Sequence, residues 1–216
     1  MSEAELVAAD GFVEPAVHAE FPGLRLSWTI VESRPQPSPR ALKQRLSALS
    51  NRYRGASVVA MRTQPIPHSY RAFFRQIGLD PDSTRIPSEE AAVERLMHGG
   101  FRSSDSVTDA LLVGLIETGV PLWALDSDQV DPGGLGIRTT VEGEPFGREG
   151  HPLPGGRLAV ADSRSVHSLL FGALAPGSVV TPRTRRITLF AVAVDGVPAI
   201  HIEEALWVTL EALTTG

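Results

Sequence analysis

Apolar positions recur with helical spacing through the first half of this chain and with strand-like spacing through much of the second half. The strongest helical pattern lies at residues 106–118, where nearly every position is apolar, as in a helix buried on all sides. We predict that Ser106 and Asp109 form a capping box at its start and that Gly119 ends it. The apolar run at 122–126 then predicts a buried strand directly after the helix.

The rest of the first half predicts further helices and two strands. Alternating apolar and polar residues predict a strand at 24–31, and a short apolar run predicts another at 58–61. Apolar spacing predicts helices at 39–53, 70–77 and 89–98, with Ser38 and Ser88 as caps of the first and last.

The second half favours strands separated by turns. Candidate strands lie near 135–141, 157–161, 166–171 and 187–194, and a final helix is expected at 203–213. Helices gathered before strands indicate an α+β fold. We expect an N-terminal arm at residues 1–20, either loose or forming a short edge strand, and a single domain at residues 21–216.

Composition agrees with a globular domain. The chain has 216 residues, of which 42% are hydrophobic and 21% charged, and one domain is the simpler expectation at this length. There is no cysteine, which fits a reducing compartment. The N-terminus lacks the pattern of a signal peptide, and apolar runs are shorter than the roughly 18 residues of a membrane helix. We therefore expect a cytoplasmic protein with no membrane partner.

Charge is unevenly distributed along the chain. The net charge is −5, yet the segment 34–79 contains nine basic residues and no acidic one. Such a segment either binds the phosphates of RNA or is a solvated surface. The candidate RNA-binding residues are Arg45, Arg52, Arg71 and Arg75; the last two are four residues apart and are expected on the polar side of their helix. DNA is not expected as a partner, and the pattern does not define an oligomeric state.

Self-sufficient catalytic motifs are absent from the sequence. There is no phosphate-binding loop, no Gly-x-Ser-x-Gly elbow and no His-Glu-x-x-His. The six histidines are scattered, with no pair four residues apart on a helix. We expect no metal and no cofactor, and no catalytic residue is assigned.

Several segments in a fixed order resemble a known family. These are Asp109 with its apolar helix and Gly119-x-Pro-Leu-x-Ala-x-Asp126, GGLGIRTTVEGEPF at 133–146, LPGGRLAVAD at 153–162, and Gly172 followed by Thr181 and Thr184. Together they resemble the B3/B4 editing module of the phenylalanyl-tRNA synthetase β subunit, and upstream segments such as SYRAFFRQIGLDP at 69–81 resemble its free-standing members. The resemblance spans roughly residues 21–195. It implies a β-sandwich-like core of unusual topology with packed helices.

The resemblance implies hydrolysis of the ester that joins a wrong amino acid to a tRNA. Such a site needs a side-chain pocket, donors that hold the ester and a positioned water. Leu112, Trp123 and Phe190 stand where synthetase sequences have asparagine, histidine and glutamate. The leading expectation is a trans-acting aminoacyl-tRNA deacylase. The alternatives are a non-catalytic module that binds tRNA or an aminoacyl ligand, and a structural protein that retains only the fold.

Seven residues are candidate substrate-binding positions: Arg102, Ser104, Asp109, Trp123, Asp126, Gly172 and Phe190. Asp109 either faces a ligand or caps its helix, and Asp126 either orients substrate or fixes a turn. The loop that holds Arg102 and Ser104 either offers N–H groups to a carbonyl or phosphate, or is a solvated connector. Gly172 either lets a substrate approach or meets a backbone requirement. Trp123 and Phe190 either pack in the core or line an apolar pocket.

Overall fold

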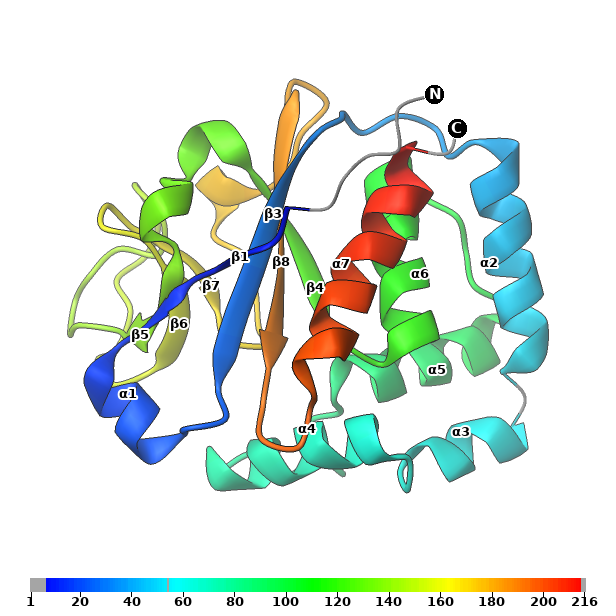
Figure 1. Cartoon of the computed structure of the whole chain (residues 1–216), viewed down its shortest axis with the longest axis horizontal. Coiled ribbons are helices and arrows are strands. Elements are labelled where there is room, and N and C mark those ends of the chain that lie inside the picture. The colour runs from blue at the N-terminus through cyan, green and yellow to red at the C-terminus, as the bar shows by residue number, and fades with distance from the viewer. Residues whose placement is uncertain (1–6, 54, 215–216) are drawn as a thin grey trace.

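The computed structural model describes residues 7–53 and 55–214. These residues form two four-stranded β-sheets with helices packed beside them. One sheet lies in the middle of the molecule, with the second sheet on one side and helices on the other (Figure 1). A single large apolar cluster joins residues from both sheets and from the helices. The α+β class and the sandwich-like core with packed helices are therefore confirmed.

The central sheet, sheet A, has the strand order β1-β3-β8-β4 and is antiparallel throughout. Its strands are β1 (Ala9–Asp10), β3 (Arg25–Glu32), β8 (Arg186–Ala193) and β4 (Leu122–Asp126). Every residue of β8 after Arg186 is buried, because both faces of this strand are covered. Trp28 of β3, Phe190 of β8 and Trp123 of β4 lie side by side in register across the sheet.

The second sheet, sheet B, has the order β2-β5-β6-β7. Its strands are β2 (Phe12–Val13), β5 (Gly136–Thr139), β6 (Leu158–Ala161) and β7 (Val166–Leu169). β2 is parallel to β5, and the other pairs are antiparallel.

One residue, Gly11, separates the edge strand β1 of sheet A from the edge strand β2 of sheet B. A Cβ atom at this position would lie 2.6 Å from the carbonyl oxygen of Leu135 and 2.6 Å from Cδ2 of Leu26. Only glycine fits, so the chain crosses from one sheet to the other within a single residue. Of the predicted N-terminal arm, residues 9–20 thus form two edge strands and helix α1 (Pro15–Glu20), and residues 1–6 lie outside the described residues.

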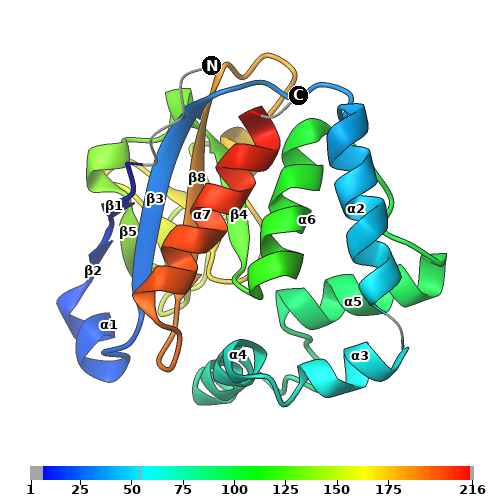
Figure 2. The ribbon, with the colours of Figure 1, turned by 45° about the vertical axis from the view of Figure 1, so that its right-hand side comes forward.

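Helices α6 (Ser106–Thr118) and α7 (Ala199–Thr214) cover the outer face of sheet A, and α2 (Arg40–Arg52) lies beside α6 (Figure 2). The two covering helices approach closely at Gly114, where an added Cβ would lie 2.2 Å from Oγ1 of Thr209. Gly119 ends α6 with φ of 76°, the left-handed conformation expected from the sequence.

Three more helices form the end of the molecule opposite the two termini (Figure 1, Figure 2). They are α3 (Gly55–Met61), α4 (Pro65–Gln76) and α5 (Pro87–His98). Single 3₁₀ turns, η1 (Ser127–Gln129), η2 (Pro132–Gly134) and η3 (Pro176–Ser178), connect the strands.

Some local predictions are wrong. Residues 58–61 belong to helix α3, because a short apolar run does not distinguish a strand from a helix with one buried face. The capping box is wrong as well: Asp105 caps α6, and its carboxylate accepts hydrogen bonds from the N–H groups of Val107 and Thr108.

Two further caps and one helix start also differ from the prediction. Neither Ser38 nor Ser88 caps a helix, since α2 begins at Arg40 and α5 begins at Pro87. Helix α7 begins at Ala199, four residues before the predicted start. Within the described ranges, no helix combines the length and apolar character that crossing a membrane requires.

Candidate functional site

Trp123 and Phe190 form an aromatic stack on the face of sheet A that carries Trp28. Their ring centroids lie 5.3 Å apart and the rings are within 14° of parallel. The stack follows from the strand register, since the two residues are direct cross-strand partners. Phe190 is fully buried, whereas Trp123 is half-buried and reaches toward solvent.

Phe171, in the loop after β7, joins this stack to helix α4. Its ring contacts Tyr70, Phe73, Phe74 and Trp123, with centroid distances of 5.4 to 5.8 Å. Its φ is 56°, a left-handed conformation that is unfavourable for a bulky residue. Backbone strain of this kind persists only where surrounding contacts hold it, and the four aromatic neighbours of Phe171 supply them.

A half-open pocket of about 370 Å³ lies at this cluster. It is lined by Pro87 and Glu90 of α5, Leu115 of α6, Pro121, Leu122 and Trp123 at the start of β4, and Phe171 and Gly172. Six of its eight lining residues have aromatic or aliphatic side chains, and the exposed Glu90 carries a carboxylate. The structure thus brings Trp123 and Gly172 together at one cavity, while Phe190 is buried and stacks on Trp123 without lining the cavity.

Asp109 lies elsewhere, fully buried in the first turn of α6. Its carboxylate accepts hydrogen bonds from the hydroxyl groups of Ser38 and Ser103 and from the backbone N–H of Ser104. These bonds tie α6 to the segment before α2 and to the loop in front of α6. Arg102 and Ser104 lie exposed on that loop.

Asp126 ends β4, and its carboxylate holds the following turn. It accepts a hydrogen bond of 2.6 Å from the Thr184 hydroxyl and one from the backbone N–H of Asp128. Neither Asp126, Asp109 nor the loop of Arg102 and Ser104 is among the residues that line the pocket at Trp123. The seven candidate residues therefore do not converge on one cavity.

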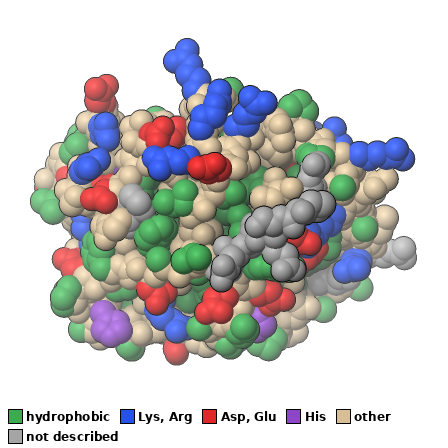
Figure 3. Space-filling view, turned by 45° about the horizontal axis from the view of Figure 1, so that its top comes forward, with side chains coloured by type: hydrophobic (Ala, Val, Ile, Leu, Met, Phe, Trp, Pro, Cys, Tyr) green, Lys and Arg blue, Asp and Glu red, His purple; other side chains and the backbone are tan. Residues whose placement is uncertain are grey.

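The four arginines proposed to bind RNA also do not lie together on one surface. Arg45 donates hydrogen bonds of 2.8 Å to Glu117 and to Glu211, so two carboxylates already compensate its charge. Arg52 and Arg75 have exposed side chains at the ends of α2 and α4. Lys and Arg side chains are instead spread over several parts of the face in Figure 3.

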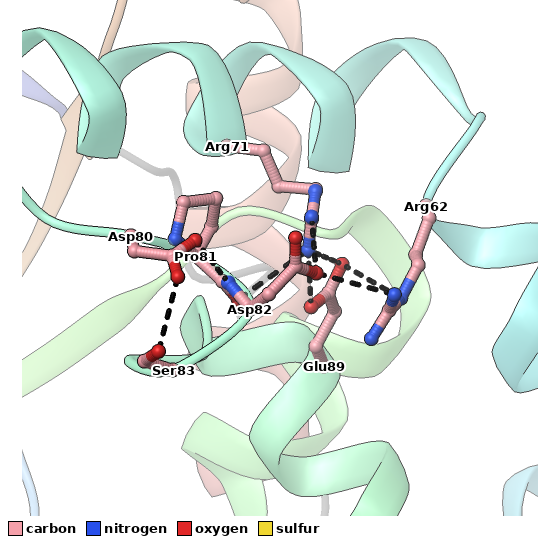
Figure 4. Close-up of polar contacts among 7 residues, drawn as sticks. All are labelled: Arg62, Arg71, Asp80, Pro81, Asp82, Ser83 and Glu89. Atoms are coloured by element: carbon pink, nitrogen blue, oxygen red, sulfur yellow. Dashed lines mark hydrogen bonds and ion pairs between the residues drawn. The ribbon is translucent and has the colours of Figure 1, made fainter.

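Arg71 is buried, so its assignment to an exposed basic patch is wrong. Its guanidinium lies 2.9 Å from the Glu89 carboxylate and 2.7 Å from Asp82, between helices α4 and α5 (Figure 4). The hydrogen bond from Arg71 lowers the pKa of the Asp82 carboxyl. Arg71 is a structural link between helices, because burial and pairing leave it no access to a phosphate.

The sequence reasoning missed a buried Asp–His–Ser chain in sheet B. Nε2 of His167 lies 3.0 Å from Oδ2 of Asp162, and Nδ1 of His167 is hydrogen-bonded to the Ser178 hydroxyl at 2.8 Å. The residue types match a catalytic triad, but His167 is 0% and Ser178 only 3% exposed. A nucleophile must reach its substrate, so this chain of bonds fixes the loop at η3 rather than serving as an active site. The spacing of Asp162, His167 and Ser178 along the sequence matches no local motif.

A larger cavity, of about 580 Å³, lies between α1, the end of α4 and sheet B. Half of its fourteen lining residues are aliphatic, and Glu20 and Arg157 add opposite charges. It contains none of the candidate residues. Volume alone assigns no chemistry to it.

The model of the B3/4 domain family matches residues 69–205, and the chain therefore belongs to that family. The matched region contains the pocket at Trp123, the aromatic stack, strands β4 and β8 of sheet A, and three of the four strands of sheet B. The resemblance inferred from the motifs is thereby confirmed.

A curated relative points to the same class. Over 120 residues, 53% of this chain, the sequence is 35% identical to the phenylalanine–tRNA ligase β subunit of Gloeobacter violaceus. The match covers 15% of that subunit, so the chain corresponds to a small part of it. These similarities place the protein in a tRNA-related family of editing domains.

Proposed function

We propose that this protein binds the aminoacylated 3′ end of a tRNA as a non-catalytic module, with the aminoacyl group in the pocket at Trp123. The observation that carries the proposal is the stack of Trp123 on Phe190, at two positions where the synthetases have polar residues. The ring stack replaces groups that would hold an ester and a water. The pocket wall suits contact with an apolar or aromatic side chain.

The rim of the pocket adds a second point of recognition. Glu90 is exposed in the first turn of α5, and its carboxylate can pair with the α-ammonium group of an aminoacyl ester. The apolar wall thus matches the side chain of the bound amino acid, and the carboxylate on the other side matches its amine. Leu112 is partly buried against the core, and its apolar side chain offers no polar group where synthetase sequences have asparagine.

A direct test compares RNA hairpins that end in a hydrolysis-resistant 3′-aminoacylamide with the same hairpins left uncharged. We expect tighter binding of the aminoacylated hairpin, and Trp123→Ala should remove that difference because it deletes one wall of the pocket. Trp207→Ala is the matched control, since Trp207 is 49% exposed on α7 and lies outside the pocket lining. Equal affinity of wild-type protein for both hairpins across apolar, aromatic and polar aminoacyl groups would refute the proposal.

Hydrolysis is the second candidate, and Glu90 is the observation that favours it. A carboxylate at the rim of a cavity can hold and polarise a water beside a bound ester. The test is deacylation of a panel of mischarged tRNAs at stoichiometric and catalytic protein concentrations. Turnover that is lost in Glu90→Gln while binding persists would establish a deacylase. Binding without turnover supports the non-catalytic module.

A further inference from the structure

Two segments far apart in the sequence bring exposed arginines together at one edge of sheet A, where strand β3 ends and strand β8 begins. β3 and β8 pair so that Glu32 lies opposite Arg186, and the backbone N–H of Ser33 donates to the carbonyl oxygen of Arg185. Arg34 therefore follows the end of β3 just where Arg185 and Arg186 lead into β8. We call Arg34, Arg185 and Arg186 the basic edge; all three side chains are exposed.

The basic edge is a hollow rather than a flat surface. Its three arginines, with Glu32 and Ser33, line a shallow depression of about 510 Å³. Figure 3 brings this end of the molecule forward and shows several Lys and Arg side chains at its upper centre, with acidic side chains beside them. Three arginines and one glutamate line the hollow, a local excess of positive charge in a chain whose net charge is −5.

The guanidinium groups of the basic edge are positioned but accessible. Nη1 of Arg185 donates to the carbonyl oxygens of Pro182 and Thr184, which fixes the side chain against its own loop. Arg186 pairs with Asp128 at 3.0 Å, but the two side chains are 53% and 63% exposed. Such an exposed pair is weak and can be exchanged for a stronger anion.

The basic edge and the aromatic pocket lie along the same strand. Arg186, Thr188 and Phe190 alternate onto one face of sheet A, because side chains repeat every two residues in a strand. Phe190, which stacks on the pocket residue Trp123, lies four positions after Arg186 in β8, a distance of about 13 Å at 3.3 Å per residue. This span corresponds to a few nucleotides of a single-stranded 3′ end.

We propose that the basic edge binds the phosphate backbone of the RNA whose aminoacyl end occupies the pocket at Trp123. The inference rests on the proposed function for its partner. Arginine forks fit phosphate oxygens with two parallel hydrogen bonds, and a hollow bordered by three of them favours a polyanion. The RNA surface is thus formed at the β3–β8 edge rather than along helices α2 and α4, where Arg45 and Arg71 are paired with carboxylates.

The experiment measures binding of an uncharged tRNA acceptor-stem hairpin as salt is raised from 50 to 200 mM. The variant Arg34→Ala/Arg185→Ala/Arg186→Ala should bind at least about tenfold more weakly at 50 mM, and the slope of log affinity against log salt should fall by two to three units, at about 0.9 per lost phosphate contact. The control Arg85→Ala/Arg148→Ala/Arg164→Ala removes the same charge from exposed arginines elsewhere and should keep the wild-type slope. Circular dichroism verifies that both variants are folded.

Three outcomes would overturn the inference. Equal weakening in both triple variants would mean that only overall charge matters. Wild-type affinity in the basic-edge variant would exclude this surface while leaving the proposed function standing. Binding of wild-type protein to phosphatidylserine vesicles but not to the hairpin would assign the surface to lipid. The proposed function is judged separately with 3′-aminoacylamido-adenosine, which has no stem: if it binds in a manner that depends on Trp123 while the hairpin does not bind, only the basic edge is refuted.

Discussion

Replacing Arg71 with methionine removes the cation from a buried ion pair and leaves the Glu89 carboxylate in the protein interior. The side chains of Arg71 and Glu89 are only 7% and 3% exposed. The nearest remaining cation is Arg62, whose Nε lies 3.9 Å from Glu89 and whose side chain is half exposed. Arg71→Met should therefore act mainly by stranding a carboxylate, not by losing packing.

The expected loss in the free energy of unfolding depends on which charged partners each variant leaves in place. Removal of one member of a buried pair costs about 3–5 kcal/mol, and Arg71→Met should lie near 4 because Arg62 compensates poorly. Glu89→Leu should cost less, about 3 kcal/mol, since Arg71 retains Asp82 at 2.7 Å. The double variant Arg71→Met/Glu89→Leu should lie within about 1 kcal/mol of wild type, because no unpaired charge is left inside.

Urea unfolding followed by circular dichroism measures all four members of this double-mutant cycle. At about 2–4 °C per kcal/mol for a chain of this size, Arg71→Met should also lower Tm by about 8–16 °C. A cost below 1 kcal/mol for Arg71→Met, or additive costs in the double variant, would refute the buried-pair reasoning. Loss of RNA binding in a folded, stable double variant would return Arg71 to the RNA surface.

Three further predictions concern packing, acid stability and the buried carboxylate of α6. Gly114→Ala should destabilise the protein by about 1–3 kcal/mol in urea unfolding, because its Cβ would lie 2.2 Å from Thr209 Oγ1, and Thr209→Ala in the same chain should recover part of the loss. The hydrogen bond from Arg138 lowers the pKa of Glu144, so this pair stabilises the fold above the unfolded-state pKa of Glu144, and its contribution is lost as pH falls through the lowered folded value. Glu144→Gln should therefore make the free energy of unfolding less dependent on pH below about 4.5. An unchanged pH dependence would contradict this. Asp109→Ala should cost about 2–4 kcal/mol in thermal or urea unfolding by leaving the buried Ser38 hydroxyl and the Ser104 N–H unpaired, whereas a similar loss for Asp105→Ala would show that capping dominates.

The helix α6 and strand β4 could be predicted from the sequence because their signals are local. A nearly continuous apolar stretch, a left-handed glycine and a following proline determine both elements without reference to the rest of the chain. The N-cap of α6 could not be predicted as reliably, since Asp105 and Ser106 are neighbouring residues that both suit this position. Asp109, the predicted partner of Ser106, is instead bound by Ser38, which is distant in sequence.

The candidate site divides along the same line. Trp123 and Phe190 lie together because they are cross-strand partners in sheet A, and Gly172 lines the same pocket as Trp123. Arg71 was misassigned because the partner that buries it, Glu89, lies on another helix. The basic edge was missed because it joins residue 34 to residues 185 and 186, and charge counted along a segment does not show contacts between strands.

The crossing at Gly11 sets an order for folding as the chain is synthesised. β1 finds its partner β3 within the first 32 residues, but Phe12 of β2 must wait for Gly136 of β5. Closing the second contact therefore costs far more chain entropy and belongs to a late step. β3 gains its other partner, β8, only when residues 186–193 have been made, so both sheets pass through stages in which a strand has an unpaired side open to mispairing with a neighbour. The single glycine at position 11 thus links a strand pairing that is local in sequence to one that spans more than half of the chain.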